Sequence, residues 1–330
     1  MIDFNDVIEA GDSNYDTITF SWDLVDICQY NCSYCASMNF NLNKFKNNPT
    51  LRNSWKNVIK LLSLNSIKNN FSVELLGGEP TIHPDIYEIV EELCKIKRCV
   101  QVELITNLAK PLSFYEKFNR QEFNKVCITP SFHPEYYKHI FVEKIIELNK
   151  LEYINIFPNI NLSDDKSKWE LTRNVIVELQ QNGVRVGVNI LQNVSEGTVG
   201  NWNNTYTDEF YEYFQYILDV PYNESNQKNV YRLEFNPTTM MVPYKLSNGT
   251  VENISEAQIN QYNLRTFRGW NCNALMYHIG MDGTIVNHCT RETFSPLDLN
   301  SKKLTACVTC PLDYCDCDTK FLYVKKKNEV

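Results

Sequence analysis

The sequence lacks three features that define common protein classes. No segment has the length and apolarity of a membrane-spanning helix. The first six residues are acidic and lack the basic and apolar regions of a signal peptide. The sequence also has fewer basic than acidic residues, since 32 Lys and Arg against 40 Asp and Glu give a net charge of −8. We therefore expect a cytoplasmic protein without a membrane partner, and a broad nucleic-acid-binding face is not indicated.

Cysteine, by contrast, is abundant and unevenly placed. Twelve cysteines in a cytoplasmic chain favour metal or redox chemistry over a disulfide framework. Three of them lie within residues 28–35 and six within 272–317. Cys94, Cys99 and Cys127 lie in or beside apolar stretches, where buried structural thiols are the simpler interpretation. The two clusters need a different explanation.

Short β-rich runs alternate with helical runs from about residue 17 to residue 235. Strands are predicted at 17–22, 71–76, 100–105, 126–130, 152–157 and 184–191. Helices are predicted at 53–69, 84–97, after Pro111, and at 138–150, 167–181 and 207–218. Six such units predict an α/β fold with a parallel sheet and outer helices. A partial (β/α)6 TIM-like barrel fits best, with a doubly wound sheet as the alternative. Chemistry in such barrels occupies loops after the carboxyl ends of the strands.

The tail after residue 235 loses this alternation. It has Cys, Gly and Pro at turn-like spacing and few long periodic runs. We therefore expect two domains, a barrel at 1–235 and a small irregular Cys-rich domain at 236–330. Metal ligation would supply stability that the apolar content of the tail does not.

The first cysteine cluster has the spacing C-x3-C-x2-C directly after the first predicted strand. Cys28, Cys32 and Cys35 on one short loop can hold three corners of a cubic [4Fe–4S] cluster and leave the fourth iron open. At this cysteine frequency, chance would produce the spacing about 0.016 times. A zinc site is the alternative, but it requires a fourth ligand close by, and His83 is distant in sequence.

This loop resembles the signature of the radical S-adenosylmethionine (radical SAM) superfamily. The resemblance implies that Cys28, Cys32 and Cys35 bind a [4Fe–4S] cluster and that S-adenosylmethionine (SAM) chelates its open iron. It further implies reductive cleavage of SAM to a 5′-deoxyadenosyl radical that abstracts a substrate hydrogen atom, with flavodoxin or ferredoxin as the electron donor. Tyr34 matches the aromatic position near the adenine, and simple loop packing is its alternative role.

A Gly-Gly-Glu-Pro motif follows the second predicted strand. Gly77 and Gly78 allow the backbone to approach a ligand closely, and Glu79 can accept a hydrogen bond from an ammonium group. With Pro80, these residues resemble the superfamily's GGEP motif, which holds the methionine amino group of SAM. The resemblance therefore predicts that the four residues bind the cofactor.

Polar residues also follow the later strands. Asn107 and Ser131 could contact the cofactor or the substrate by their position. His133 is predicted as a catalytic group, because an imidazole can donate, accept or carry a proton near neutrality; the alternative is a histidine that caps the next helix. Weaker candidates are Asn189, Gln192, Glu234 and Asn236.

The second cysteine cluster has two parts. Cys272 and Cys289 flank Gly283, and Cys307, Cys310, Cys315 and Cys317 follow as C-x2-C-x4-C-x-C. A structural zinc ribbon is one interpretation. The arrangement also resembles the SPASM or twitch extension of radical SAM enzymes, which implies an auxiliary [4Fe–4S] cluster. The set is one cysteine short of the seven in that pattern, so one cluster is preferred over two. Spacing does not select four ligands from the six.

The substrate is the least defined part of the prediction. Extensions of this kind accompany enzymes that modify peptides or proteins, which is the preferred expectation. Oxidation or rearrangement of a small carbohydrate-like or nucleoside substrate is the alternative. A non-catalytic iron–sulfur or zinc protein is the hypothesis from another class. Since the first strand begins near residue 17, we expect no fused N-terminal peptide-recognition domain. A peptide would then bind through a separate carrier or directly in a groove.

Overall fold

The computed structural model describes eleven stretches of the chain: residues 2–12, 16–35, 48–64, 66–191, 207–218, 241–255, 258–259, 262–294, 300–313, 315 and 323–328. Within these residues, none of the helices combines the length and the apolarity that a membrane crossing requires.

Six parallel strands form the central sheet in the order of the sequence. They are β2 (Ile18–Val25), β3 (Phe71–Gly77), β4 (Cys99–Thr106), β5 (Val126–Phe132), β7 (Asn159–Leu162) and β8 (Gly187–Ile190). A doubly wound sheet would reverse its strand order at a switch point, whereas a barrel keeps the order of the sequence. The described strands do not close into a barrel. The prediction of a partial barrel is therefore confirmed.

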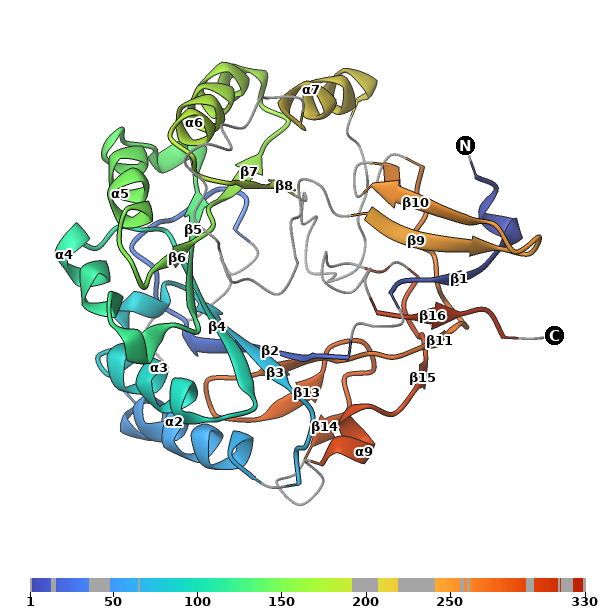
Figure 1. Ribbon diagram of the computed structural model, residues 1–330, viewed down its shortest axis with the longest axis horizontal. Coiled ribbons are helices and arrows are strands. Elements are labelled where there is room, and N and C mark those ends of the chain that lie inside the picture. The colour runs from blue at the N-terminus through green and yellow to red at the C-terminus, as the bar shows by residue number, and fades with distance from the viewer. Residues whose placement is uncertain are drawn as a thin grey trace.

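The helices lie outside the arc of strands (Figure 1). They are α2 (Pro49–Leu62), α3 (Ile86–Lys95), α4 (Leu112–Tyr115), α5 (Ile140–Asn149), α6 (Trp169–Gln181) and α7 (Asp208–Leu218). Single-turn 3₁₀ helices occur at η1 (Phe4–Asp6), η2 (Pro80–Ile82), η3 (Glu116–Phe118), η4 (Gln121–Phe123), η5 (Pro134–Tyr136) and η6 (Lys166–Lys168).

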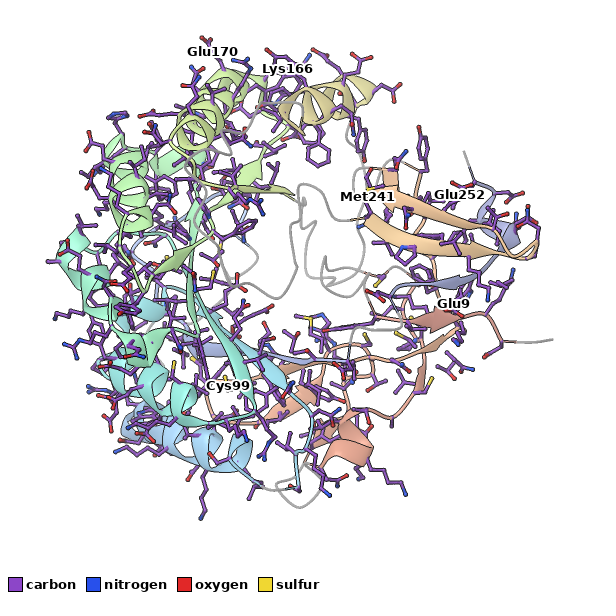
Figure 2. The ribbon with its side chains drawn as sticks, in the orientation of Figure 1. Glu9, Cys99, Lys166, Glu170, Met241 and Glu252 are labelled. Atoms are coloured by element: carbon purple, nitrogen blue, oxygen red, sulfur yellow. The ribbon has the colours of Figure 1, made fainter. Side chains whose placement is uncertain are left out.

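Alternate strand residues pack into the core between sheet and helices. Phe20 and Trp22 of β2 and Val73 and Leu75 of β3 are buried in this core. Side chains alternate between the two faces of a strand, so the residues between them face the interior of the arc. Cys99, at the start of β4, is fully buried (Figure 2), as the apolar context predicted.

A second sheet of six strands lies beside the arc (Figure 1). Its order is β10 (Val251–Ser255), β9 (Met241–Leu246), β1 (Val7–Ala10), β16 (Lys325–Lys326), β11 (Asn271–Cys272) and β15 (Val308–Thr309). The N-terminal strand β1 pairs antiparallel with both β9 and β16. Residues from the two ends of the sequence therefore share one sheet and one hydrophobic cluster.

The tail also extends the central sheet. β12 (Met276–Ile279) pairs parallel with β2, and β13 (Ile285–Asn287) and β14 (Thr293–Phe294) continue the sheet to ten strands. A short helix, α9 (Ser301–Leu304), follows. The division of the chain at residues 235 and 236 stays a prediction.

The fifth predicted strand is interrupted. In place of one strand at 152–157, the structure has the two-residue β6 (Asn155–Ile156), and β7 continues the pairing with β5 after Pro158. Proline has no amide hydrogen for the ladder, so it breaks a strand at this point. The helix predicted at 53–69 begins earlier and ends at Leu62.

Candidate active site at the cysteine loop

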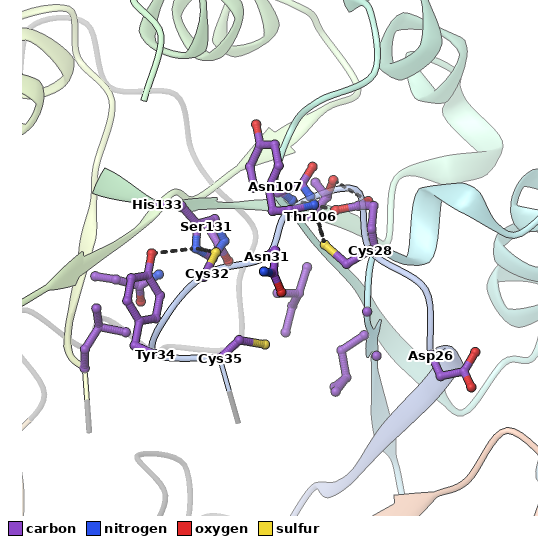
Figure 3. Close-up of a pocket in the computed structure, with 18 residues that line it drawn as sticks. Asp26, Cys28, Asn31, Cys32, Tyr34, Cys35, Thr106, Asn107, Ser131 and His133 are labelled. Atoms are coloured by element: carbon purple, nitrogen blue, oxygen red, sulfur yellow. Dashed lines mark hydrogen bonds between the residues drawn. The ribbon is translucent and has the colours of Figure 1, made fainter. Parts of the chain in front are cut away.

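A cavity of about 400 Å³ lies at the carboxyl ends of the parallel strands. Loops after β2, β3, β4 and β5 all contribute to its wall (Figure 3). Most of the predicted site residues meet here: Cys28, Cys32, Tyr34, Cys35, Gly77, Gly78, Glu79, Asn107, Ser131 and His133. Pro80 instead lies buried at the start of η2, next to this wall.

Three cysteine side chains line this cavity, and within its described lining there is no fourth. Cys32 is buried, Cys28 is half-buried and Cys35 is exposed. In the part of the chain that the structure describes, no three His, Cys, Asp or Glu side chains converge where a single metal ion could bind. Three thiolates of a [4Fe–4S] cluster bind three different irons, so convergence on one point is not required. The donor set therefore fits a cluster with one open corner.

Burial controls the protonation of these thiols. Desolvation raises the pKa of Cys28, and it raises the pKa of Cys32 to about 11. Without metal, both side chains therefore carry protons at neutral pH. Iron binding must displace those protons, which couples cluster assembly to pH.

Asn107 contacts the cysteine loop directly. Its Nδ2 donates to Cys28 Sγ at 3.6 Å, and the backbone N–H of Tyr30 donates to the same sulfur at 3.4 Å. The side-chain oxygen of Asn107 accepts from Gln29 Nε2 and from the Ala109 N–H, both at 3.0 Å. Two donors to the oxygen fix the orientation of the amide, so its nitrogen points at the sulfur.

The two glycines admit a close approach between backbone segments. The Gly78 N–H donates to Val25 O and the Glu79 N–H donates to Ile27 O, both at 2.7 Å. A Cβ atom on Gly77 would lie 2.2 Å from Val25 O, and one on Gly78 would lie 2.3 Å from Ile27 O. The sequence predicts that these glycines allow a ligand to approach. In the structure they also allow the backbone after β3 to pack against the end of β2 that leads into the cysteine loop.

Glu79 is 1% exposed and is held by four protein donors. It accepts from Thr106 Oγ1 at 2.7 Å, from the Asn107 N–H at 2.8 Å, from the Thr81 N–H at 3.1 Å and from the Thr81 hydroxyl. Burial raises the pKa of Glu79, and these hydrogen bonds oppose that rise. The carboxylate therefore joins the ends of β3 and β4 beneath the cavity.

His133 lies between two residues of the cysteine loop. Its Nδ1 is 3.5 Å from Cys32 Sγ and 3.0 Å from the Tyr34 hydroxyl (Figure 3). The imidazole and the Tyr34 ring are within 8° of parallel. Burial lowers the pKa of His133 to about 4, so the imidazole is neutral at pH 7. A neutral imidazole has one donor and one acceptor nitrogen, which suits contact with a sulfur or a hydroxyl.

Glu135 and Tyr136 hold the same loop, a role that the sequence did not predict. Glu135 Oε2 accepts from the Ser33 N–H at 2.9 Å, and the Ser33 hydroxyl donates to the other oxygen. The Tyr136 hydroxyl accepts from the Asn31 N–H at 2.8 Å, and its ring stacks on Tyr30 at 4.4 Å. Together with His133 they form an anchoring turn, residues 133–136. Its position directly after β5 was the only available signal.

We expect Tyr136→Phe to loosen the cysteine loop without removing the ring stack. The variant loses the acceptor for the Asn31 N–H, so the free energy of unfolding should fall by about 1 kcal/mol. Chemical denaturation measures this change. Tyr216→Phe is the matched control, because that ring is 53% exposed and should change stability by less than about 0.5 kcal/mol. Equal effects of the two variants would contradict this role.

The second cysteine cluster divides between buried and exposed positions. Cys272, Cys310 and Cys315 are buried in the core of the second sheet, and Cys289 packs against that core. Cys307 is exposed. Cys317 lies outside the described residues, as do Gln192, Glu234, Asn236 and the side chain of Asn189.

The four cysteines of this core lie near one another. Burial raises the pKa of Cys272 to about 12, and negative charge on Cys315, Cys289 and Cys310 would raise it further. Lys325, which is 1% exposed, is the cross-strand neighbour of Cys272, and its charge lowers that pKa. A buried ammonium beside Cys272 suits a group that carries negative charge.

Comparisons with known proteins find a matching family and solved structures of similar fold. The sequence model described as the Radical SAM superfamily matches residues 22–191. The structure of native anSMEcpe with bound AdoMet and Cp18Cys peptide has a TM-score of 0.52 and 14% identity, over 87% of this chain and 79% of that chain. Histidine-tagged anSMEcpe with bound AdoMet has a TM-score of 0.53 and 13% identity, over 87% of this chain and 80% of that chain. SuiB from Streptococcus suis, bound to S-adenosylmethionine, has a TM-score of 0.49 and 13% identity, over 85% of this chain and 63% of that chain. A sequence search of curated proteins finds no match.

The fold is a partial barrel, and its cavity lies at the carboxyl ends of the parallel strands. Because the family match spans more than half of the residues, the chain belongs to the radical SAM superfamily. It is therefore a radical-initiating enzyme, and the family implies a [4Fe–4S] cluster and SAM as its cofactors.

Proposed function

We propose that Cys28, Cys32 and Cys35 hold the [4Fe–4S] cluster and that the enzyme modifies a peptide or protein. The observation that carries the cluster assignment is the single cavity shared by these three sulfurs, Gly78 and Glu79. When bound, the cluster and SAM supply a 5′-deoxyadenosyl radical that takes a hydrogen atom from a substrate C–H bond. Flavodoxin or ferredoxin is the proposed electron donor, in the cytoplasm.

The residues of the chain position these groups and tune them. Asn107 and the Tyr30 N–H donate to Cys28 Sγ, and His133 is placed to donate to Cys32 Sγ. Hydrogen bonds to cluster sulfurs offset negative charge and favour the reduced state. We propose that His133 acts by positioning Cys32, while a proton-transfer role stays a prediction.

The remaining cavity wall suits SAM. Tyr34 offers a ring for the adenine, and its hydroxyl contact with His133 fixes that ring in place. The backbone of Gly77 and Gly78 and the side chain of Ser131 offer polar groups on the same wall. Pro80 supports this wall from η2.

Asn107→Asp should lower the reduction potential of this cluster. The carboxylate keeps the acceptor for Gln29 and Ala109 but removes the donor to Cys28 Sγ and adds negative charge. Loss of about 1 kcal/mol of differential hydrogen bonding corresponds to about 40 mV for a one-electron couple. A redox titration followed by electron paramagnetic resonance (EPR) measures the shift. Asn119→Asp adds the same charge away from the cavity and should leave the potential unchanged; a shift of equal size there would contradict the role of Asn107.

The tail is proposed to hold one auxiliary [4Fe–4S] cluster in a SPASM- or twitch-like domain. We assign Cys272, Cys289, Cys310 and Cys315 as its ligands, since these four meet in the core of the second sheet. The buried Lys325 beside Cys272 supports an anionic group there over four protonated thiols.

Iron counting tests the assignment of ligands. Anaerobically reconstituted enzyme should contain about eight irons per chain, and Cys310→Ala should retain about four. Cys307→Ala, which removes an exposed cysteine, should keep the full content. Zinc in the tail with about four irons per chain would support the zinc ribbon instead.

The proposed peptide or protein substrate is supported by a solved structure of similar fold. That structure holds a peptide, the Cp18Cys peptide of anSMEcpe. A small carbohydrate-like or nucleoside substrate remains the alternative. A short precursor peptide encoded beside the gene would favour the peptide substrate. Neighbouring genes of a sugar-nucleotide pathway would favour the small-molecule substrate.

Product analysis tests the reaction itself. Reconstituted enzyme with dithionite and SAM should release 5′-deoxyadenosine under anaerobic conditions. Iron-loaded enzyme that releases none would contradict the proposed function and favour a non-catalytic iron–sulfur protein.

A further inference from the structure

One carboxylate in the cavity differs from all the groups described above. Asp26, the first residue after β2, lines the cavity and is only 3% exposed. Its Oδ1 is buried and accepts no hydrogen bond from the described residues. Glu79, the other buried carboxylate of the same wall, accepts from two hydroxyls and two backbone amides. A buried carboxylate oxygen without a donor is costly, so it marks a place where a ligand group completes the site.

The position of Asp26 separates it from the cluster. In Figure 3, Asp26 lies at the opposite end of the cavity from Tyr34. Its carboxylate points away from Cys28, whose sulfur faces Asn107. A ligand group that meets Asp26 therefore lies beyond the part of the cavity where the cysteine sulfurs gather.

The sheet continues this acidic character below the cavity. Leu76 of β3 and Ile105 of β4 line the cavity, so the residues two positions earlier, Glu74 and Glu103, face the same interior. The strand register places Glu74 beside Glu103. Asp23 of β2 is level with Leu76 in the same register.

Lysine and arginine are absent from the described part of this surface. No Lys or Arg lines the described cavity, and none lies on the interior face of β2, β3, β4 or β5 as the structure describes them. One partner comes from the tail, where His278 Nε2 on β12 is 3.2 Å from Asp23 Oδ2. Within the lining that the structure describes, the cavity therefore carries the carboxylates of Asp26 and Glu79 and no lysine or arginine.

We propose that Asp26 and the acidic interior face form a subsite for a cationic substrate group, an amine or a guanidinium. This proposal rests on the proposed function, and it narrows the substrate to a peptide or protein segment that carries a Lys or Arg side chain or an amino terminus. An ammonium or guanidinium supplies the donors that Asp26 Oδ1 lacks and balances the buried charge.

SAM also carries an ammonium, so the test is made with SAM already bound. Three peptides, Ac-Gly-Lys-Gly-NH2, Ac-Gly-Gln-Gly-NH2 and Ac-Gly-Glu-Gly-NH2, are titrated by anaerobic calorimetry into cluster-loaded enzyme at saturating SAM. The lysine peptide should bind about 10-fold or more tighter than the glutamate peptide. Asp26→Asn should reduce this preference to about 3-fold or less. Glu88→Gln, which removes an exposed charge on α3 outside the barrel, should keep it.

The same titrations give the results that would overturn the subsite. No preference in the wild type, or an unchanged preference in Asp26→Asn, overturns the proposal. A weaker affinity for SAM with an unchanged peptide preference also overturns it, because it would assign Asp26 to the cofactor. Because Asp26 Oδ1 accepts no hydrogen bond from the described residues, Asp26→Asn should keep a melting temperature at or above that of the wild type. A lower melting temperature would show that other residues of the protein stabilise the carboxylate, and it would overturn the subsite. Failure of the proposed function is seen separately, as absence of 5′-deoxyadenosine from the wild type.

Discussion

Cys32→Ala should abolish 5′-deoxyadenosine formation, a loss on the order of 10³-fold or more. The radical source needs three protein thiolates, and Cys32 is the most buried of the three, in contact with His133. Alanine leaves the cluster with two ligands on the cysteine loop. Iron content, the EPR spectrum of the reduced cluster and product formation should fall together.

The control for this variant is a thiol outside the cavity. Cys94→Ala removes a half-buried cysteine on α3 and should keep both iron content and product formation near wild type. A Cys32→Ala enzyme that retained the cluster and its turnover would overturn the assignment of the loop. Loss of activity in both variants would indicate unfolding, which chemical denaturation detects.

Gly78→Ala should destabilise the fold by about 3 kcal/mol and prevent cluster loading. Its added Cβ would lie 2.3 Å from Ile27 O and 2.4 Å from Ile27 C, so the backbone segments must separate. That separation breaks the bonds from the Gly78 and Glu79 amides to the strand end before Cys28. Chemical denaturation measures the stability, and iron analysis measures the loading.

Gly249→Ala is the matched control for this steric effect. Gly249 has a φ of +86° and no neighbour within 4 Å of an added Cβ. The substitution should therefore cost only the strain of a left-handed backbone, about 1 kcal/mol, and should leave iron loading intact. Equal losses at both positions would show that the backbone contact at Gly78 is not the cause.

Much of the architecture could be predicted because its signals are local. The alternation at 17–22 and the helical spacing at 138–150 each report a single element, and the structure has β2 and α5 there. The spacing from Cys28 to Cys35 and the motif at 77–80 are also local, so a sequence displays them completely. Where the local signal was mixed, as at Pro158, the predicted strand was wrong in extent.

The contacts that span long stretches of sequence could not be predicted. Ser33 and Glu135 are 102 residues apart and meet because parallel strands bring the loops after β2 and β5 to one edge of the sheet. His278 and Asp23 are further apart still and meet because β12 pairs with β2. Cys272 lies on β11 and Cys310 directly follows β15, so the pairing of these two strands brings both cysteines into one core.

The sequence by itself determined the elements, the cysteine loop and the Gly-Gly-Glu-Pro motif, because each depends on residues within a few positions of one another. Only the tertiary structure decided what surrounds them: the anchoring turn at 133–136, the second role of Gly78 and the unpartnered oxygen of Asp26. The physical reason is that hydrogen-bond satisfaction and steric contact depend on which distant segments the sheet places together, and no local pattern records that placement.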